Sequence, residues 1–598
     1  MKKRLLKLAL SGVLIAMSVA IGIICKNFLT FGIYYRITFE NLPVILAGII
    51  LGPVYGAAVG ALSDVVSCIS SVNPVVNPVI TVGAAAVGLV AGLIPKLIVR
   101  KRSLLQYALS AYSAHLIGQV ALKSVGKMLY YGMPLYGAFI GLGISVAVAA
   151  VETFIVFSIM KLLPVKKLDK SVNSKSYSEC CRYLDKLRKR GSRMSLDGMT
   201  AAMRELGDPQ DKIKVIHVAG TNGKGSVSKM LAAALTAAGY RTGLYITPYL
   251  AQRVDSLYLS GNAIKRDEFS DLCGRLIRTS EKFKLTEYEF LTAAAYLWFY
   301  ESGVDVAVVE CCMGGTDDAT NIVKKPLLSC ITGVSRDHMK ILGDTVYEIA
   351  RNKAGIIKPG CPAVVGVCGD EVKKAVDQRA AEVGSTVYYV DDGSIERESM
   401  TEDGITLSYK DHRSVKLSLT GDHQFRNAAC ALEACDILSK CGFDTDDKAV
   451  KAAFGDLKFE ARFEKLASDP SFVFDGAHNE EGVQSFVRTY KSLYGDEACV
   501  IITGVMRDKE YEKMAEALSG IALEVKTVSP DNPRALSAEK LAEAYRSLGV
   551  NAEAYDNVFD AASAATESAK KSGKKVFAVG SLYMYNEIKR SVERLLLK

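Results

Sequence analysis

The chain has 598 residues, of which 49% are hydrophobic and 23% charged; this composition excludes a disordered, collagen-like or coiled-coil protein and predicts about three or four domains. The net charge of +9 is unevenly spread, because residues 1–170 hold 16 Lys and Arg against four acidic residues, a local charge of +12, which leaves −3 for the remainder. The basic residues flank apolar runs and form no stripe with aromatic side chains, so we expect no nucleic acid partner.

Residues 1–168 are predicted to form an all-α membrane domain of six helices. Between Leu8 and Ile94 only four side chains are charged, which a soluble domain almost never shows. A cleaved signal peptide is disfavoured, because five further apolar segments follow the first one. The second and third segments are short for a bilayer that needs about 20 helical residues. The expected helices span 5–25, 40–53, 54–71, 78–98, 104–126 and 134–163.

Positive charge predicts how this domain is oriented. Lys and Arg cluster before the first helix, between the fourth and fifth, and after the sixth. Such clusters mark cytoplasmic loops, and six helices place all three on one side. We therefore expect a multi-pass protein of the bacterial plasma membrane, with its N-terminus and its C-terminal part in the cytoplasm. The 14 cysteines form no CxxC pair, in agreement with reduced thiols.

The second to fourth helices carry a specific pattern. ITFENLPVILAGIILGPVYGAAVGALSDVVS (37–67) resembles the substrate-specific S components of energy-coupling-factor (ECF) vitamin transporters, and NPVVNPVITVGAAAVGLVAGL (73–93) resembles their folate-specific members. The resemblance implies an outward-facing vitamin pocket and docking onto a T subunit that is driven by two ATPase subunits. The mid-helix acid Asp64 is as consistent with a structural contact as with a transport role.

Five residues of this domain are candidate sites. Arg36 could meet a folate carboxylate or lie at the membrane interface as a snorkelling cation. Asn73 and Asn77 could hydrogen-bond a pterin or shape the two Asn-Pro turns. Ala16 and Ala20 are four residues apart, which permits close helix contact, and by the resemblance they would dock the T subunit.

A phosphate-binding loop opens the second part of the chain. An apolar strand at 215–218 leads into GTNGKGS (220–226), and an apolar helix at 227–238 follows. In this context the glycine N–H groups and the helix N-terminus hold phosphate, Lys224 reaches the terminal phosphate oxygens and Ser226 ligates Mg²⁺. The spacing departs from the standard motif, because Gly225 separates that lysine from the serine.

GTNGKGS is the signature of the Mur ligase superfamily, and a series of motifs across 176–598 resembles folylpolyglutamate synthase/dihydrofolate synthase. In order, the motifs include HVAGTNGKGSV, GLYITPYL, VVECCMGGTDDATN, DHMKILGDTVYEIARNKAGIIKPG, GDHQFRNAACALEA, FDGAHNEEG and SPDNPRALSAEKLAE. The resemblance implies an ATP-dependent ligase that activates a folate γ-carboxylate as an acyl phosphate and joins it to L-glutamate. Dihydrofolate synthase activity is one alternative, and a degenerate domain that only binds folate is another.

The same resemblance assigns site residues. The catalytic residues would be Lys224, Glu310, His338 and Lys353. The ATP site would comprise Gly220, Thr221, Asn222, Gly223, Lys224, Gly225, Ser226, Asn427 at the adenine, Arg462 at the phosphates, and Asp475 and His478 on the ribose side. Two Mg²⁺ sites would use Ser226, Thr247, Glu310, His338 and a carbamylated Lys353, and a K⁺ ion is allowed.

Two positions depart from the family pattern. Thr316 stands where the family usually has Arg, which puts the anion contact of that loop in doubt, and Tyr249 replaces a His. Glu287 and Glu289 are expected at a solvated helix start.

The expected architecture of the second part is α/β. Residues 169–195 should form a polar linker and the start of the ligase, and residues 196–458 the ATP-binding central domain with a largely parallel sheet. Residues 459–598 alternate strands and helices and should form a smaller Rossmann-like domain, with the active site between the two. The whole chain is thus predicted to couple folate uptake to polyglutamylation. The alternatives for the membrane half are another vitamin or a simple anchor.

Overall fold

The computed structural model describes residues 2–31, 35–70, 76–98, 104–162, 176–250 and 252–597. It divides into two compact units, Met1–Lys175 and Ser176–Lys598. The domain boundaries predicted at 168, 195 and 458 stay predictions.

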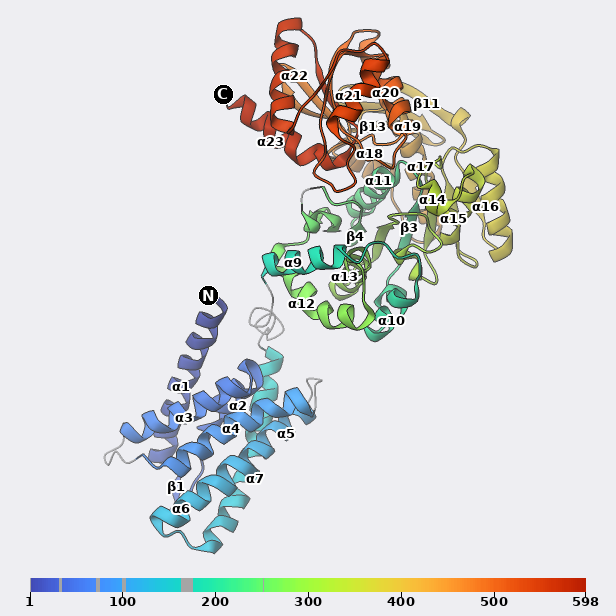
Figure 1. The fold of residues 1–598 in the computed structure, drawn as a ribbon. Helices are drawn as coiled ribbons and strands as arrows, with labels where there is room; N and C mark the ends of the chain where they lie inside the picture. Colours follow the sequence, from blue (N-terminus) through green and yellow to red (C-terminus); the bar gives the residue numbers. More distant parts are fainter. Residues whose placement is uncertain are drawn as a thin grey trace. The chain divides into compact units, whose positions relative to one another are not determined.

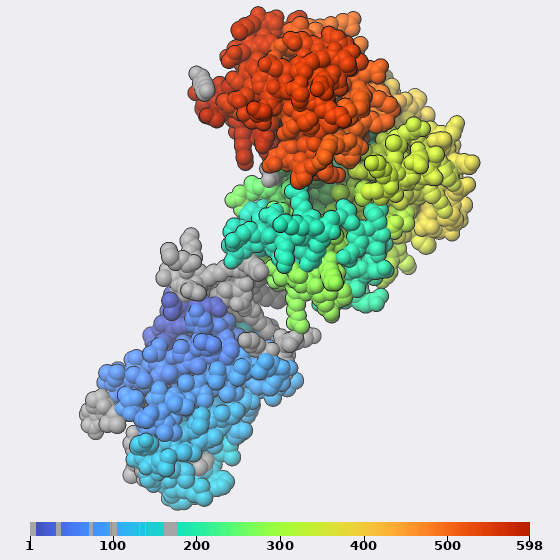
Figure 2. All heavy atoms as spheres, in the orientation of Figure 1, coloured from blue at the N-terminus to red at the C-terminus, as the bar shows by residue number. Residues whose placement is uncertain are grey.

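The first unit is a bundle of helices (Figures 1 and 2). Each of the six predicted segments contains helix, and the fifth consists of three consecutive pieces, of which the middle one, η1, is a π-helix. The elements are α1 (Lys2–Phe28), α2 (Asn41–Leu51), α3 (Pro53–Ile69), α4 (Pro78–Leu97), α5 (Leu104–Ala114), η1 (His115–Lys123), α6 (Ser124–Tyr131) and α7 (Leu135–Leu162).

Three helical stretches among the described residues are long and apolar enough to cross a bilayer: Lys7–Phe28, Pro78–Pro95 and Leu135–Met160. The short hairpin β1 (Thr30–Phe31) and β2 (Tyr35–Arg36) follows α1 and was not predicted. Glycines let α3 and α4 approach closely, since a Cβ on Gly88 would lie 2.0 Å from the carbonyl oxygen of Gly56, as is common where helices pack in membranes.

The second unit contains an eight-stranded sheet in the order β10-β9-β8-β3-β7-β4-β5-β6. It is largely parallel, as predicted, and only β5 and β6 run antiparallel to their neighbours. The strands are β3 (Val215–Ala219), β4 (Thr242–Tyr245), β5 (Leu257–Leu259), β6 (Asn262–Ala263), β7 (Val306–Glu310), β8 (Leu328–Ile331), β9 (Ala363–Val365) and β10 (Val387–Tyr389).

Helices cover both faces of this sheet (Figure 1). Alternate residues of β3 serve different cores: Ile216 packs toward α11 and α17, and Val215 toward α9, α12 and α13. This two-sided burial explains the unbroken apolar strand. The helices are α9 (Tyr177–Arg188), α10 (Asp197–Glu205), α11 (Lys224–Ala237), α12 (Arg266–Phe283), α13 (Glu287–Ser302), α14 (Met339–Leu342), α15 (Val346–Lys353), α16 (Asp370–Val383), α17 (Asp422–Lys440) and α18 (Asp447–Gly455).

Two further sheets complete the unit. An antiparallel sheet, which was not predicted, comprises β11 (Ile395–Thr401), β12 (Gly404–Tyr409) and β13 (His412–Leu417). A six-stranded sheet follows in the order β14-β15-β19-β16-β17-β18, and only its first pair is antiparallel. Its strands are β14 (Glu464–Ser468), β15 (Ser471–Asp475), β16 (Cys499–Thr503), β17 (Ala522–Thr527), β18 (Ala552–Ala554) and β19 (Val576–Val579). Its helices are α19 (Glu480–Tyr494), α20 (Tyr511–Ser519), α21 (Ala538–Ser547), α22 (Val558–Ser572) and α23 (Tyr585–Leu596).

Candidate functional site

The glycine-rich loop lies between the carboxyl end of β3 and the start of α11, where helix N–H groups favour an anion. Thr221 fixes the loop to the chain after β8: its N–H donates to Gly333 O at 2.7 Å and its hydroxyl to Ser335 O at 3.1 Å. The loop is therefore held by two neighbouring strands at the sheet edge where open α/β folds bind ligands.

Two loop glycines permit close approach of other side chains. A Cβ on Gly220 would lie 1.9 Å from Thr332 Oγ1, and one on Gly223, whose φ is +85°, would lie 2.2 Å from Asn427 Oδ1. The structure thus places Asn427 of α17 against the loop, where its Nδ2 donates to Gln424 Oε1 at 3.0 Å.

Two lysine side chains converge on the carbonyl oxygen of Gly220. Lys224 Nζ donates to it at 3.0 Å and Lys353 Nζ at 2.7 Å. Lys353 is 3% exposed, and burial, together with the charge of Lys224, lowers its pKa to about 7. The amine is therefore partly uncharged at neutral pH, which is the form that can react with CO₂.

Three of the predicted metal ligands border the loop. The Glu310 carboxylate at the end of β7 accepts a hydrogen bond from the N–H of Thr247 at 3.1 Å. Glu310 also lies close to the loop residue that precedes Ser226, since a Cβ on Gly225 would be 3.7 Å from Glu310 Oε2. Burial raises the pKa of Glu310 to about 7, against the lowering effect of the Lys224 charge. One buried carboxylate and two hydroxyls beside a phosphate loop are oxygen ligands that fit Mg²⁺.

His338 follows β8 and has a left-handed φ of 52°, which is uncommon for a residue with a side chain. Burial lowers its pKa, and the charges of Lys224 and Lys353 contribute, so its imidazole is neutral at pH 7 and able to ligate a metal. Among the described residues no three His, Cys, Asp or Glu side chains form a group that could hold a metal ion. A bound ion would therefore also need hydroxyl, carbamate or phosphate oxygens.

Arg462 comes from the C-terminal part of the unit. Its guanidinium carbon lies 5.2 Å from the centre of the Phe459 ring, and its Nη1 donates to Ala461 O at 3.2 Å. Burial lowers its pKa, and the charges of Asp475 and Glu310 oppose this. The guanidinium is therefore held near the buried carboxylate of the loop site.

Asp475 and His478 are engaged with the backbone. The two carboxylate oxygens of Asp475 accept from the N–H groups of Phe463 at 2.9 Å and Ala477 at 2.8 Å, so this side chain holds two loop segments together. His478 Nδ1 lies 2.9 Å from Gly476 O. Burial and the charge of Lys509 lower the pKa of His478 to about 4, which makes it neutral.

A polar network that the sequence did not predict joins the loop to the C-terminal part. Lys509 Nζ pairs with Asp337 Oδ1 at 2.6 Å. Asn222 Nδ2 donates to Glu481 Oε2 at 2.6 Å, and Asn479 Nδ2 donates to Asn222 Oδ1 at 3.2 Å. The sequence offered one clue to this network, because Asp337 immediately precedes His338, which was a predicted site residue.

A cavity lies beside the loop. Lys229, on α11, lies over the rings of Tyr258 at 5.3 Å and Phe459 at 4.5 Å, and burial lowers its pKa. Both rings line the cavity, together with Thr247 and Arg462. Aromatic and basic groups thus meet next to the phosphate loop.

Thr316 and Tyr249, the two positions that depart from the family pattern, each donate a hydrogen bond to a neighbouring segment. The Thr316 hydroxyl donates to Asn352 O at 2.9 Å, which a longer arginine would not reproduce. Tyr249 Oη donates to Glu287 Oε1 at 3.3 Å, and Arg253 Nε donates to the same oxygen at 2.8 Å.

The expectation that the start of α13 is solvated was wrong. The Glu287 side chain is 14% exposed because Arg253 covers it. Glu289 is 3% exposed and closes a capping box, in which its carboxylate accepts from Thr286 N at 2.7 Å.

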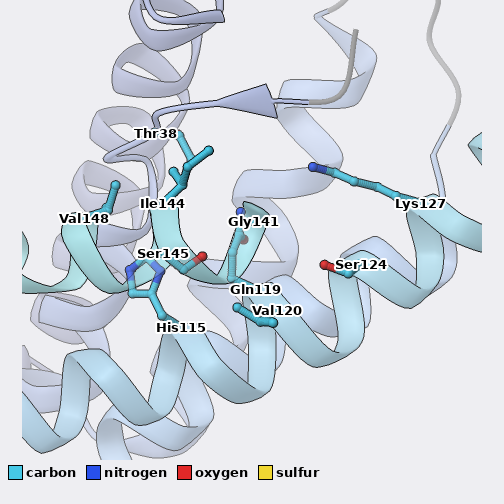
Figure 3. Close-up of a pocket in the computed structure, with 10 residues that line it drawn as sticks. All are labelled: Thr38, His115, Gln119, Val120, Ser124, Lys127, Gly141, Ile144, Ser145 and Val148. Carbon is cyan, nitrogen blue, oxygen red and sulfur yellow. The ribbon is translucent and has the colours of Figure 1, made fainter. Parts of the chain in front are cut away.

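The first unit has a polar cavity of its own between η1, α6 and α7 (Figure 3). Figure 3 shows His115, Gln119 and Ser124 facing Ser145 on α7, with the Lys127 amine directed toward the cavity. Of the residues predicted for transport, those whose side chains the structure describes, Asn77, Ala16 and Ala20, do not line this cavity.

The predicted transport residues lie elsewhere. Arg36 ends β2, its side chain is outside the described part, and Asn73 lies outside the described residues. Asn77 caps α4, accepting from Val79 N at 3.0 Å. Ala16 and Ala20 are exposed on α1.

Three family models match the chain. Residues 218–435 match the Mur ligase middle domain, residues 461–582 match the Mur ligase glutamate ligase domain, and residues 6–165 match the substrate-specific component of ECF transporters. A dihydrofolate synthase/folylpolyglutamate synthase of Bacillus subtilis (strain 168) is 32% identical over 431 residues, which cover 70% of this chain and 99% of the relative.

The chain belongs to the folylpolyglutamate synthase/dihydrofolate synthase family of Mur ligases. It is an ATP-dependent ligase of this family fused to an ECF substrate-specific component. A folylpolyglutamate synthase of Lacticaseibacillus casei is 33% identical over 348 residues, covering 56% of this chain and 81% of the relative.

Solved structures agree with this assignment. The folylpolyglutamate synthase of Mycobacterium tuberculosis, complexed with ADP and AMPPCP, has a TM-score of 0.64 and 28% identity over 70% of this chain and 99% of its own. A folylpolyglutamate synthase complexed with AMPPCP and folate has a TM-score of 0.60 and 27% identity over 71% of this chain and 100% of its own.

Proposed function

We propose that this protein takes up folate through its membrane domain and traps it by adding L-glutamate in its ligase part. The observation that carries the proposal is the fusion itself, because an ECF substrate-specific component and a folylpolyglutamate synthase-type ligase lie on one chain. Each added glutamate brings a further carboxylate, and charged groups cross the apolar bilayer core poorly. The polyglutamylated product would therefore remain in the cell.

In the proposed membrane topology six helical segments span the bilayer, and the N-terminus and the ligase lie in the cytoplasm. Three long apolar helices support it, together with the positive clusters of the sequence. The exposure of both Ala16 and Ala20 on α1 supports docking of the T subunit there, because small residues at this spacing allow close helix contact. The two ATPase subunits would complete the transporter.

For the ligase we propose a two-step reaction. A γ-carboxylate oxygen of folate attacks the γ-phosphorus of ATP, the bond to ADP breaks, and an acyl phosphate forms. The amino group of glutamate then attacks the acyl carbon, and phosphate and a proton leave. Lys224 and Arg462 would balance the phosphate charge, and the loop N–H groups would orient the phosphates.

Bound Mg²⁺ would supply further neutralisation of phosphate charge. The buried Glu310 carboxylate, the hydroxyls of Ser226 and Thr247 and the imidazole of His338 would fit such an ion, and a carbamate on Lys353 would supply an oxygen ligand for a second. The lowered pKa of Lys353 supports carbamylation, in which the amine bonds to CO₂ and releases a proton. The K⁺ ion stays a prediction.

Dihydrofolate synthase activity is the second candidate, because the B. subtilis relative bears both names. Incubating the purified protein with ATP and glutamate, and with either dihydropteroate or tetrahydrofolate, separates the two. We expect tetrahydrofolate to be the better acceptor.

The trapping proposal is tested with labelled folate in cells. Lys224→Ala should abolish ligation, so cells carrying it should lose label after a chase, whereas cells with the wild type retain it. Lys265→Ala, a change of an exposed lysine, is the matched control. Equal retention with the inactive ligase would overturn trapping.

A further inference from the structure

A stripe of positive charge runs along the outer face of α9, which lies beside α12 in the second unit (Figure 1). The inner face of the helix is fully buried in the core and includes Cys180, Leu184 and Leu187. Residues three and four positions apart share one helix face, so Arg182, Lys186 and Lys189 lie together on the opposite face, where all three are exposed. We call these three residues the basic stripe.

The acidic side chains of α9 do not neutralise the basic stripe. Glu179 closes the capping box of the helix, where its carboxylate accepts from Ser176 N at 2.7 Å. Asp185 pairs with Arg253 at 2.6 Å. Among the described residues, α9 and the two residues that follow it form ion pairs through Asp185 and Arg190 and none through the basic stripe. The stripe is therefore available to an anion from outside the chain.

The helix dipole explains only part of this charge. Cations are favoured in the last turn of a helix, where Lys186 lies and which Lys189 caps. Arg182 is the sixth of the twelve residues of α9, and the dipole effect has faded there. The stripe thus extends beyond the part of the helix in which cations stabilise the helix itself.

The stripe follows closely on the last apolar helix of the first unit. That helix, α7, ends at Leu162 and α9 begins at Tyr177, so 14 residues (163–176) connect them. The connecting residues include four lysines and one acidic residue. Clusters of basic residues just beyond the cytoplasmic end of a membrane helix bind anionic lipid, and a tether of this length raises the effective concentration of α9 at the bilayer.

We propose that the basic stripe of α9 docks on the anionic phospholipid headgroups of the membrane that the first unit spans. The phosphate groups of such lipids lie at the bilayer surface, and cations spaced along one helix face meet several of them at once. The docked helix keeps the ligase at the surface where the proposed uptake delivers folate. The inference goes beyond the proposed function and rests on the proposed topology, in which α9 lies on the cytoplasmic side.

The test uses the purified full chain in lipid nanodiscs and measures energy transfer from tryptophan to a dansyl-labelled lipid. Trp298 is the single tryptophan of the sequence and belongs to the same core cluster as Leu184 of α9, so it reports how near this part of the ligase lies to the lipid. The discs contain phosphatidylcholine alone or a mixture with phosphatidylglycerol. We expect at least about twofold more transfer in the anionic discs. About 1 M salt should remove the difference, because it shortens the screening length to about 3 Å.

A triple variant decides whether the stripe is responsible. Arg182→Gln/Lys186→Gln/Lys189→Gln should show equal transfer in the two kinds of disc. The matched control loses the same total charge at three exposed lysines elsewhere, Lys448→Gln in α18 and Lys570→Gln/Lys571→Gln in α22. It should keep the full difference. Both variants should retain glutamate addition in detergent, which shows that their ligase is folded. A wild type with equal transfer in both discs, or a stripe variant that keeps the difference, would overturn the inference.

The topology has a separate test, because both faces of a nanodisc are open and the disc measurement does not depend on orientation. Protease added to intact spheroplasts should leave the ligase uncut if it lies in the cytoplasm. Digestion of the ligase would overturn the topology and the docking that rests on it. An uncut ligase together with equal transfer in the two discs would overturn the docking alone.

Discussion

The buried carboxylate of Glu310, a predicted metal ligand, lowers the folding stability of the protein at neutral pH. Its carboxylate is 2% exposed, and burial raises its pKa to about 7. Because this pKa lies above that of the unfolded chain, the folded state loses stability as the pH rises from about 4.5 to 7. A neutral amide of the same shape would avoid this cost.

We therefore predict that Glu310→Gln raises the Tm of the nucleotide- and metal-free protein at pH 8 and lowers ligase activity by at least about 100-fold. The sequence has one tryptophan, Trp298, and it is buried in α13, so its fluorescence reports unfolding of this unit. A Tm that falls, or activity that survives, would contradict the prediction.

The loop glycine Gly223 allows a matched comparison with Gly239. Both have positive φ, +85° and +93°, but a Cβ would strike Asn427 Oδ1 only at Gly223, and nothing lies within 4 Å at Gly239. Alanine at either position should cost about 1–2 kcal/mol of backbone strain. Only Gly223→Ala should also lose affinity for AMPPCP, measured by calorimetry. Equal affinities in the two variants would show that the loop tolerates displacement of Asn427.

At the scale of elements, the side chain of His412 links the strand β13 to the helices α17 and α18. It lies on β13, and its ring nitrogens are 3.0 Å from Asp436 of α17 and 3.2 Å from Asp447 of α18. The hydrogen bond to Asp436 raises the pKa of His412 most, burial opposes this, and the charge of Asp436 and Asp447 add to it. The stabilisation is therefore complete below the unfolded pKa of about 6.5 and is lost as the pH rises through the folded value.

His412→Gln should accordingly destabilise the protein by an amount on the order of 1 kcal/mol at pH 6, with a smaller effect at pH 9. Urea unfolding followed by Trp298 fluorescence at both pH values measures this difference. A penalty that is equal at the two pH values would show that His412 acts by packing alone.

Periodicity and apolar runs predicted most elements. The strands β16 and β19 lie in the part of the chain for which alternating strands and helices were predicted, because buried parallel strands are unbroken apolar runs with clear ends. The antiparallel strands β11–β13 escaped prediction, since β11 has mostly exposed polar residues. The π-helix also escaped, because a π-turn changes backbone hydrogen bonds without changing composition.

The residues of the ligase site that lie at or just after the end of a strand could be predicted from sequence motifs. Glu310 ends β7 and the glycine loop follows β3, and parallel strands bring such ends together. The pair of Asp337 and Lys509 was not predictable in this way, because it joins segments 172 residues apart. The cavity of the first unit was missed for a similar reason, since its polar residues are spread over the segment before α2 and over η1, α6 and α7.

At the scale of the whole molecule, the two units have separate cores. The cluster of buried side chains in the first unit contains residues such as Val44, Val87 and Met160. The clusters of the second unit draw on residues from Cys180 onward. Each unit therefore has hydrophobic clusters of its own, as a domain that can fold by itself does.

We therefore predict that residues 176–598 alone form a soluble, active ligase. The fragment retains α9, whose Cys180, Leu184 and Leu187 are fully buried in the core around α12 and α13. Its kcat/KM for ATP-dependent glutamate addition should lie within about twofold of the full chain in detergent, as expected for independent domains.

A second fragment that begins at residue 196 serves as the comparison. It lacks α9 and should unfold at a lower temperature, because the core loses these three apolar side chains. Fragments of equal Tm would show that α9 contributes nothing to that core, and an inactive 176–598 fragment would show that the ligase needs the membrane domain.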